Sequence, residues 1–125
     1  AFWGESRVIS VFVNVYLRLA VTLNTTWLIN SAAHTFGYKP YDAAISPADS
    51  TLISAIAAGE GGHNYHHTFP QDYRTSELSV WTNWTRGLIE WLASIGQAYD
   101  LRTASDDVIK SQMAAKGDGH RHYYD

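Results

Sequence analysis

The sequence predicts an all-α protein in which one long apolar helix precedes several short helices, one of them carrying a group of histidines. Three observations support this fold class. An apolar run without Gly or Pro covers residues 8–29, three histidines stand at helical spacing within 63–67, and apolar residues recur at helical spacing over 81–95. Apolar residues repeated every three or four positions form one face of an α-helix. The chain of 125 residues is long enough for one domain of this kind.

Composition narrows the class of protein. The chain is 46% hydrophobic and 14% aromatic, which is aromatic-rich for a soluble domain and consistent with a membrane contact. Its net charge is −3, and its Lys and Arg residues are scattered, so no basic patch indicates nucleic acid as a partner. It has no cysteine, which excludes disulfides and thiolate metal sites. It begins with Ala1 and shows no signal peptide, so we expect it to be the C-terminal part of a longer protein.

The first element is a helix over Val8 to Ile29. Its 22 residues would rise about 33 Å, enough to cross a hydrocarbon core of about 30 Å. Hydropathy alone leaves a soluble core helix nearly as favoured, because Arg18 is costly in lipid unless it faces protein or the interface. Polar residues also recur every fourth position, so one face should meet other protein; they are Ser10, Asn14, Arg18, Thr22, Thr26, Asn30 and His34.

A loop and a short helix follow. The turn-forming residues Gly37, Pro40, Asp42 and Pro47 predict an ordered loop. Ser46-Pro47-Ala48-Asp49 resembles a helix start, with a cap residue, a proline in the first turn and an acidic residue near the positive end. We therefore expect a helix from there to about Ala58, with an apolar packing stripe of Leu52, Ile53 and Ile56.

The chemistry of the chain is concentrated in a histidine box, set in glycine and closed by Pro70. His63, His66 and His67 stand at i, i+3 and i+4, which places them on one helix face. Three imidazoles aimed at one point suit a transition metal, but their spacing does not distinguish zinc, copper, iron and nickel. The zinc-protease motif H-E-x-x-H would place a glutamate directly after the first histidine, where this chain has Asn64. A metalloprotease is therefore excluded.

Two charged residues near the box have alternative interpretations. Glu60 would share the face of His63 if the helix starts that early, and could then accept the distal imidazole N–H, or it could simply lie at the surface. Arg74 could bind a phosphate or a carboxylate, and we expect a carboxylate.

Two further helices are expected after the box. The first carries an apolar stripe that suits either core packing or a bilayer surface, and it should end at Gly96; the stripe is Trp81, Trp84, Leu88, Trp91, Leu92 and Ile95. The second should start at Ser105-Asp106-Asp107 and end at Gly117-Asp118-Gly119. His120 and His122 in the tail are expected to be solvated and not to bind metal.

These blocks, in this order, resemble the integral-membrane acyl-CoA desaturases of the delta-9 or stearoyl-CoA type, from about Phe2 to Gly119. The blocks are Asn30-Ser31-Ala32-Ala33-His34, Gly37-Tyr38-Lys39-Pro40-Tyr41-Asp42, Gly59-Glu60-Gly61, His63 to Pro70, Asp72-Tyr73 and Ala98-Tyr99-Asp100. The resemblance implies that residues 1–34 are the last of four transmembrane helices with its cytosolic extension. Residues 35–119 would then form a cytosolic histidine-box region, and residues 120–125 a tail.

The resemblance also implies roles for individual residues. His34, His63, His66 and His67 would be direct ligands of a di-iron centre, Asn30 would reach one iron through water, and no catalytic residue would act apart from these ligands. Thr26 and Trp27 would line a bent acyl tunnel, although an interfacial anchor remains an alternative for Trp27.

The implied enzyme inserts a cis double bond at delta-9 into saturated acyl-CoA. It would use Fe2+, O2 and electrons from cytochrome b5 and its reductase. The implied location is the endoplasmic reticulum membrane, in contact with membrane lipid and with the metal site facing the cytosol.

The chain departs from a whole enzyme of this family. His63, His66 and His67 correspond to the family's third box, and its two earlier boxes, H-x-x-x-x-H and a further H-x-x-H-H, are absent from these 125 residues. We therefore expect this fragment alone to be inactive. A related histidine-box membrane hydroxylase or oxygenase, or an inactive truncated membrane module, remain alternatives.

Overall fold

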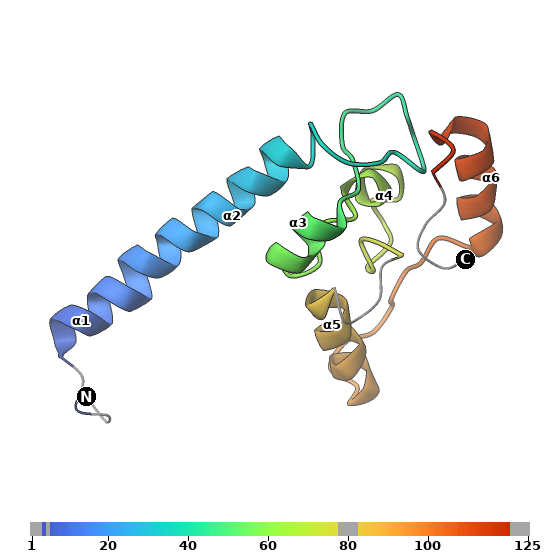
Figure 1. The fold of residues 1–125 in the computed structure, drawn as a ribbon. Coiled ribbons are helices and arrows are strands. Elements are labelled where there is room, and N and C mark those ends of the chain that lie inside the picture. The colour runs from blue at the N-terminus through green and yellow to red at the C-terminus, as the bar shows by residue number, and fades with distance from the viewer. Residues whose placement is uncertain (1–3, 5, 78–82, 121–125) are drawn as a thin grey trace.

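The N-terminal part of the chain is one long helix. The computed structural model describes residues 4, 6–77 and 83–120, in which α1 (Arg7–Val11), the π-helical segment η1 (Phe12–Leu17) and α2 (Arg18–Ala32) follow one another without a break. Figure 1 shows most of this helix extending away from the other helices, with only its C-terminal end near α3. Its 26 residues are long and apolar enough to cross a membrane, and its apolar window is 0% buried within the chain. The predicted helix over residues 8–29 is confirmed.

Polar side chains on this helix bond to their own backbone. The Thr26 hydroxyl donates to the carbonyl of Thr22 at 2.9 Å, and the Asn14 amide donates to the carbonyl of Ser10 at 3.0 Å. Such bonds to the carbonyl four residues earlier satisfy a polar group without a second helix. Some of the polar residues that recur every fourth position are therefore compatible with an apolar surrounding.

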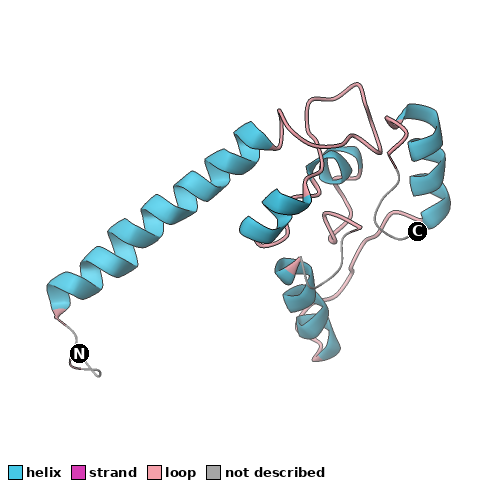
Figure 2. Cartoon of the chain, in the orientation of Figure 1, coloured by secondary structure: helices cyan, strands magenta, loops and turns pink. Residues whose placement is uncertain are grey.

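The rest of the described chain consists of short helices joined by ordered loops. They are α3 (Thr51–Ile56), α4 (His63–Thr68), α5 (Trp84–Ser94) and α6 (Asp106–Lys116). Figure 2 shows helices and loops only, because the described residues form isolated backbone bridges and no strand. The predicted all-α class is confirmed.

The helix expected to start at Ser46 starts later. α3 begins at Thr51, and the Ser50 side chain accepts the N–H of Ile53 as its cap. Asp49 is instead extended, because its N–H and C=O both pair with the backbone of Tyr38, at 2.7 and 2.9 Å. In the expected apolar stripe only Ile53 is buried, while Leu52 and Ile56 are exposed within this chain. The prediction was wrong because local cap residues do not reveal a long-range backbone pairing.

Two small apolar clusters hold these helices together. Ala33, Ile53 and Ala57 join the end of the long helix to α3. Tyr41, Tyr65 and Ile109 join the loop after the long helix to α4 and α6. One cluster therefore packs the segment that carries His34 against α3, and the other packs α4 against the loop that follows that segment.

The predicted ends of α6 and the predicted C-terminal end of α5 are confirmed, whereas α5 begins only at Trp84, with Asn83 as its N-cap. α6 has Ser105 and Gly117 at its caps, and Gly96 follows α5 with a φ of +75°. Within the part of the chain that the structure describes, the apolar stripe of α5 is largely exposed: Trp84 and Trp91 are 72% and 58% exposed, while Leu92 is half-buried. Trp81 lies outside the described residues.

Candidate metal centre

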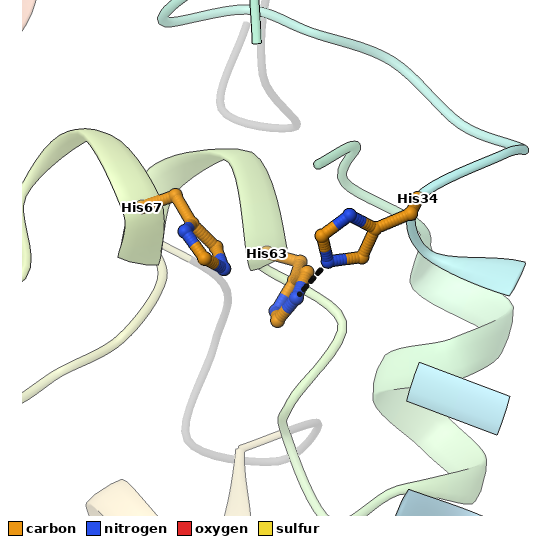
Figure 3. A group of neighbouring side chains, drawn as sticks. All are labelled: His34, His63 and His67. Atoms are coloured by element: carbon orange, nitrogen blue, oxygen red, sulfur yellow. Dashed lines mark hydrogen bonds between the residues drawn. The ribbon is translucent and has the colours of Figure 1, made fainter. Parts of the chain in front are cut away.

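Three of the four predicted ligands converge. His34 lies in the turn after α2, and His63 and His67 lie one turn apart on α4. One ring nitrogen from each lies within 4.8 Å of the other two, and the Nε2 atoms of His34 and His63 are 3.0 Å apart. Figure 3 shows the three rings facing a common point. Histidines 29 residues apart are thereby brought to one place.

His66 lies beside this group and is not part of it. Its ring centroid is 5.6 Å from that of His67 and 6.3 Å from that of His63. Its Nδ1 is buried and has no hydrogen-bond partner among the described residues. The structure thus gives three converging nitrogens and a fourth imidazole at their edge.

The state of these imidazoles fits a metal site. Burial, followed by the nearby charges of His67, His34 and His66, lowers the pKa of His63 to about 4. Burial also lowers the pKa of His67. A metal binds the neutral ring, so a lowered pKa keeps the lone pair available at neutral pH. The Nδ1 of His63, like that of His66, is a buried polar atom without a partner among the described residues. Such nitrogens fit a site that holds a metal.

The other predicted site residues lie along the long helix. Asn30 is exposed on its last turn, one turn before His34. Trp27 is 61% exposed, and the Thr26 hydroxyl is bonded to its own helix. All three side chains are exposed in the described part of the chain, which tests neither role. A water-mediated contact for Asn30 and a tunnel lining for Thr26 and Trp27 therefore stay predictions.

Glu60 does not have the placement that its predicted role required. α4 begins at His63 with Gly62 at its N-cap, so Glu60 lies in the preceding turn and not on the helix face of His63. Its role beside His63 therefore stays a prediction without support from the helix geometry.

A partner for His34 was missed. The Oγ of Ser46 lies 3.0 Å from Nδ1 of His34, at hydrogen-bond distance. A partner at the distal ring nitrogen sets the tautomer and orientation of a metal-binding imidazole. Ser46 lies twelve residues after His34 on the loop, so no helical spacing could have indicated it.

The buried carboxylate of Asp72 binds α4 through the hydroxyl of Tyr65. Asp72 accepts hydrogen bonds from the Arg74 guanidinium at 2.5 Å, the Tyr65 hydroxyl at 2.6 Å and the Ala104 N–H at 2.8 Å. The expectation that Arg74 binds a carboxylate is confirmed. Burial alone would raise the pKa of Asp72, but the bonds from Arg74, Tyr65 and Ala104 outweigh burial and lower it to about 2.

This network predicts a loss of stability in acid. The pKa of Asp72 is lower in the folded chain than its ordinary value of 3.8, so its contribution is present above about pH 4 and is lost as the pH falls towards 2. We expect the melting temperature of the full-length protein to fall over that window, and to fall less steeply in the Asp72→Asn variant. Asp100, an exposed partner of Arg102, provides the control, since Asp100→Asn should leave the fall in melting temperature between about pH 4 and 2 unchanged.

The tail histidine that the structure describes is not part of this group. His120 pairs with Asp118 at 3.2 Å and its ring contacts Tyr38. His122 lies outside the described residues.

Comparison with known proteins adds close relatives. No protein-family model matches the chain. The chain is 51% identical to the Delta(9)-fatty-acid desaturase fat-6 of Caenorhabditis elegans over 93% of its own length and 34% of that protein. It is 51% identical to the Stearoyl-CoA desaturase of Homo sapiens (95% and 33%) and 50% identical to the Acyl-CoA Delta(11) desaturase of Choristoneura rosaceana (94% and 35%). The chain thus spans about a third of the length of these curated relatives.

Proposed function

Because the chain belongs to the family of stearoyl-CoA and Delta(9) fatty-acid desaturases, we propose that it is the C-terminal part of a membrane fatty acyl-CoA desaturase and supplies part of its metal site. The observation that carries this proposal is the convergence of His34, His63 and His67, whose ring nitrogens lie within 4.8 Å of one another. The desaturase names of relatives at about 50% identity supply the reaction class.

The proposed centre is a pair of Fe2+ ions, completed by histidines from the rest of the protein. His34, His63 and His67 would bind one iron, because their nitrogens share one point. His66 would bind the other, because its buried Nδ1 lies beside that group and outside it. Asn30 would reach an iron through water from the last turn of α2. Nitrogen ligands of this kind are compatible with iron.

The chemistry needs an oxidant that polar side chains cannot provide. When bound, the irons would supply O2 activation: O2, two electrons from cytochrome b5 and its reductase, two protons and two hydrogens from an unactivated stretch of a saturated acyl-CoA would leave as two waters. The chain's own part is to hold neutral imidazoles in place and to position the acyl chain, for which we propose Thr26 and Trp27 as lining residues. No separate acid or base from this chain is required.

The proposed arrangement in the membrane divides the chain into the three parts that the family resemblance implies. Residues 1–34 would be the last transmembrane helix with its cytosolic extension, residues 35–119 the cytosolic histidine-box region and residues 120–125 a tail. The apolar helix Arg7–Ala32 supports the first part by its length and composition. We propose the endoplasmic reticulum membrane as the location, with the metal site facing the cytosol.

The test uses the full-length protein, since this chain alone is expected to be inactive. It would be purified in detergent, given saturated acyl-CoA, O2, cytochrome b5 and its reductase, and its product examined for the presence and position of a double bond. We expect a cis-delta-9 product. A double bond elsewhere, as the name of the Choristoneura relative allows, would correct the position alone. A hydroxylated acyl chain would favour the hydroxylase alternative, and no product would favour an inactive module.

Two substitutions on the long helix should have different effects in that assay. Trp27→Ala should loosen the tunnel, changing chain-length preference with iron still bound, because a large side chain is lost from the proposed lining. The matched control for Trp27→Ala is Trp91→Ala, which removes another exposed tryptophan, on α5. An unchanged chain-length profile in Trp27→Ala would contradict the tunnel assignment.

Asn30→Ala should lower activity more mildly than loss of a histidine, because a second water can partly replace the contact.

A further inference from the structure

The helix that carries three of the histidines cannot hold its position alone. α4 has six residues, and isolated helices of that length are unstable in water. Its N-cap residue is Gly62, which has no side chain to accept the first free N–H groups. The cap comes from elsewhere in the chain, because Oδ1 of the buried Asp49 accepts from the N–H groups of Asn64 at 2.7 Å and Tyr65 at 3.2 Å. A carboxylate there also suits the positive end of the helix.

Asn64, the residue that excluded a zinc protease, joins this helix to the loop before α3. Its Oδ1 accepts from the N–H groups of Tyr41 and Asp42, at 2.9 and 3.1 Å. Its Nδ2 donates to the carbonyls of Asp42 and Pro47, both at 2.9 Å. The side chain is 0% exposed, and these contacts use both of its acceptor sites and both of its donors. Asn64 therefore connects α4 to both ends of the segment 41–47.

The same loop also holds His34. Its residue Ser46 lies 3.0 Å from Nδ1 of His34, and the N–H of Ala48 donates to the carbonyl of Ala33 at 2.6 Å. The loop thus contacts the turn that carries His34 on one side and α4 on the other. A displacement of α4 relative to this loop would change the distance between the nitrogens of His34 and His63.

We propose that Asn64 and Asp49 are positioning residues that fix α4 against this loop, so that His63 and His67 stay within reach of His34. The inference rests on the proposed metal-binding function and adds to it the groups that set the ligand geometry. Neither residue is a ligand: each acts through the helix that carries the ligands. Groups of this kind typically affect metal affinity by about 10–100-fold.

The test measures metal retention in the full-length protein. Iron-loaded Asn64→Ala and Asp49→Ala variants would be mixed with a chelator, and the rate of iron release from folded protein recorded. We expect release about 10–100-fold faster than in the unsubstituted protein. Asp49→Asn should keep most of the iron retention that Asp49→Ala loses, because its amide oxygen can still accept both N–H groups. Asn64→Asp places a carboxylate oxygen against the carbonyls of Asp42 and Pro47 in place of both donors, so it should release iron at least as fast as Asn64→Ala.

The matched control is Asn83→Ala. Asn83 is another buried asparagine, and it caps α5 and donates to the carbonyl of Arg74 at 2.7 Å, so its loss should lower stability without hastening iron release. Release from Asn64→Ala and Asp49→Ala at the rate of the Asn83→Ala variant would overturn the inference. If the alanine variants do not fold, Asn64→Ser, which keeps one hydroxyl in place of the amide, decides by the same comparison, and Asp49→Asn remains the variant expected to retain iron.

A separate measurement distinguishes this inference from the proposed function. Each protein would be loaded with Co2+, whose visible absorption reports on bound nitrogens and needs no acyl-CoA turnover. A changed spectrum in Asn64→Asp and an unchanged one in Asn83→Ala would support positioning even if no desaturase activity were found. Identical spectra in the two variants and the unsubstituted protein would overturn it while leaving the desaturase proposal in place.

Discussion

In the full-length protein, replacing His63 by alanine is expected to abolish the proposed conversion of saturated acyl-CoA to its monounsaturated product. Alanine removes a nitrogen that lies 3.0 Å from Nε2 of His34, at the centre of the converging group. Loss of a group that merely supports a ligand typically costs 10–100-fold, so loss of the ligand itself should cost more than about 100-fold. The same result is expected for His34, His66 and His67. Product formed per minute, with cytochrome b5 and its reductase in excess, is the measurement.

The control for this series is His120→Ala. His120 pairs with Asp118 and is not part of the group, so its loss should leave turnover unchanged. Equal turnover in the His63→Ala and His120→Ala proteins would contradict the site. Loss in His63→Ala with full activity in His66→Ala would correct the ligand set to three.

Replacing Asp72 by alanine should give the largest loss of stability outside the histidines. The change leaves the Arg74 guanidinium, whose side chain is 19% exposed, without its carboxylate, and removes the acceptor of the Tyr65 hydroxyl and the Ala104 N–H. Removing one partner of a buried ion pair costs about 3–5 kcal/mol. Because Arg74 keeps some contact with water, we expect the lower end of that range. Since Tyr65 lies between His63 and His66 on α4, iron retention should fall as well.

The measurement is the free energy of unfolding of the full-length protein in denaturant. Asp100→Asn, which removes the charge of an exposed partner of Arg102 and is tolerated at the positive φ of residue 100 (+55°), should cost less than about 1 kcal/mol. A similar small loss in Asp72→Ala would show that the network around Arg74 does not hold α4.

The sequence predicted the features that local spacing determines. The long helix follows an uninterrupted apolar run, α6 lies between Ser105 and Gly117, and both appear within a few residues of their expected bounds. His63 and His67 converge because residues four apart share a helix face. The family resemblance, not spacing, supplied His34.

Features that depend on distant backbone contacts could not be read in this way. Asp49 has the composition of a local helix start, yet its backbone pairs with Tyr38 and its carboxylate caps α4 fifteen residues later. Ser46 meets His34 only because the intervening loop folds back. The predicted role of Glu60 depended on where α4 begins. That start is set by Gly62 and by the Asp49 carboxylate, and not by the histidines.

The central claim, that this chain supplies ligands from both His34 and the box, is tested most directly by the iron content of the full-length protein. Iron per polypeptide would be measured by elemental analysis in the unsubstituted protein and in the His34→Ala, His66→Ala and His120→Ala variants. The account predicts lower iron in His34→Ala and His66→Ala and unchanged iron in His120→Ala. Iron content in His34→Ala and His66→Ala equal to that of the unsubstituted protein would contradict it.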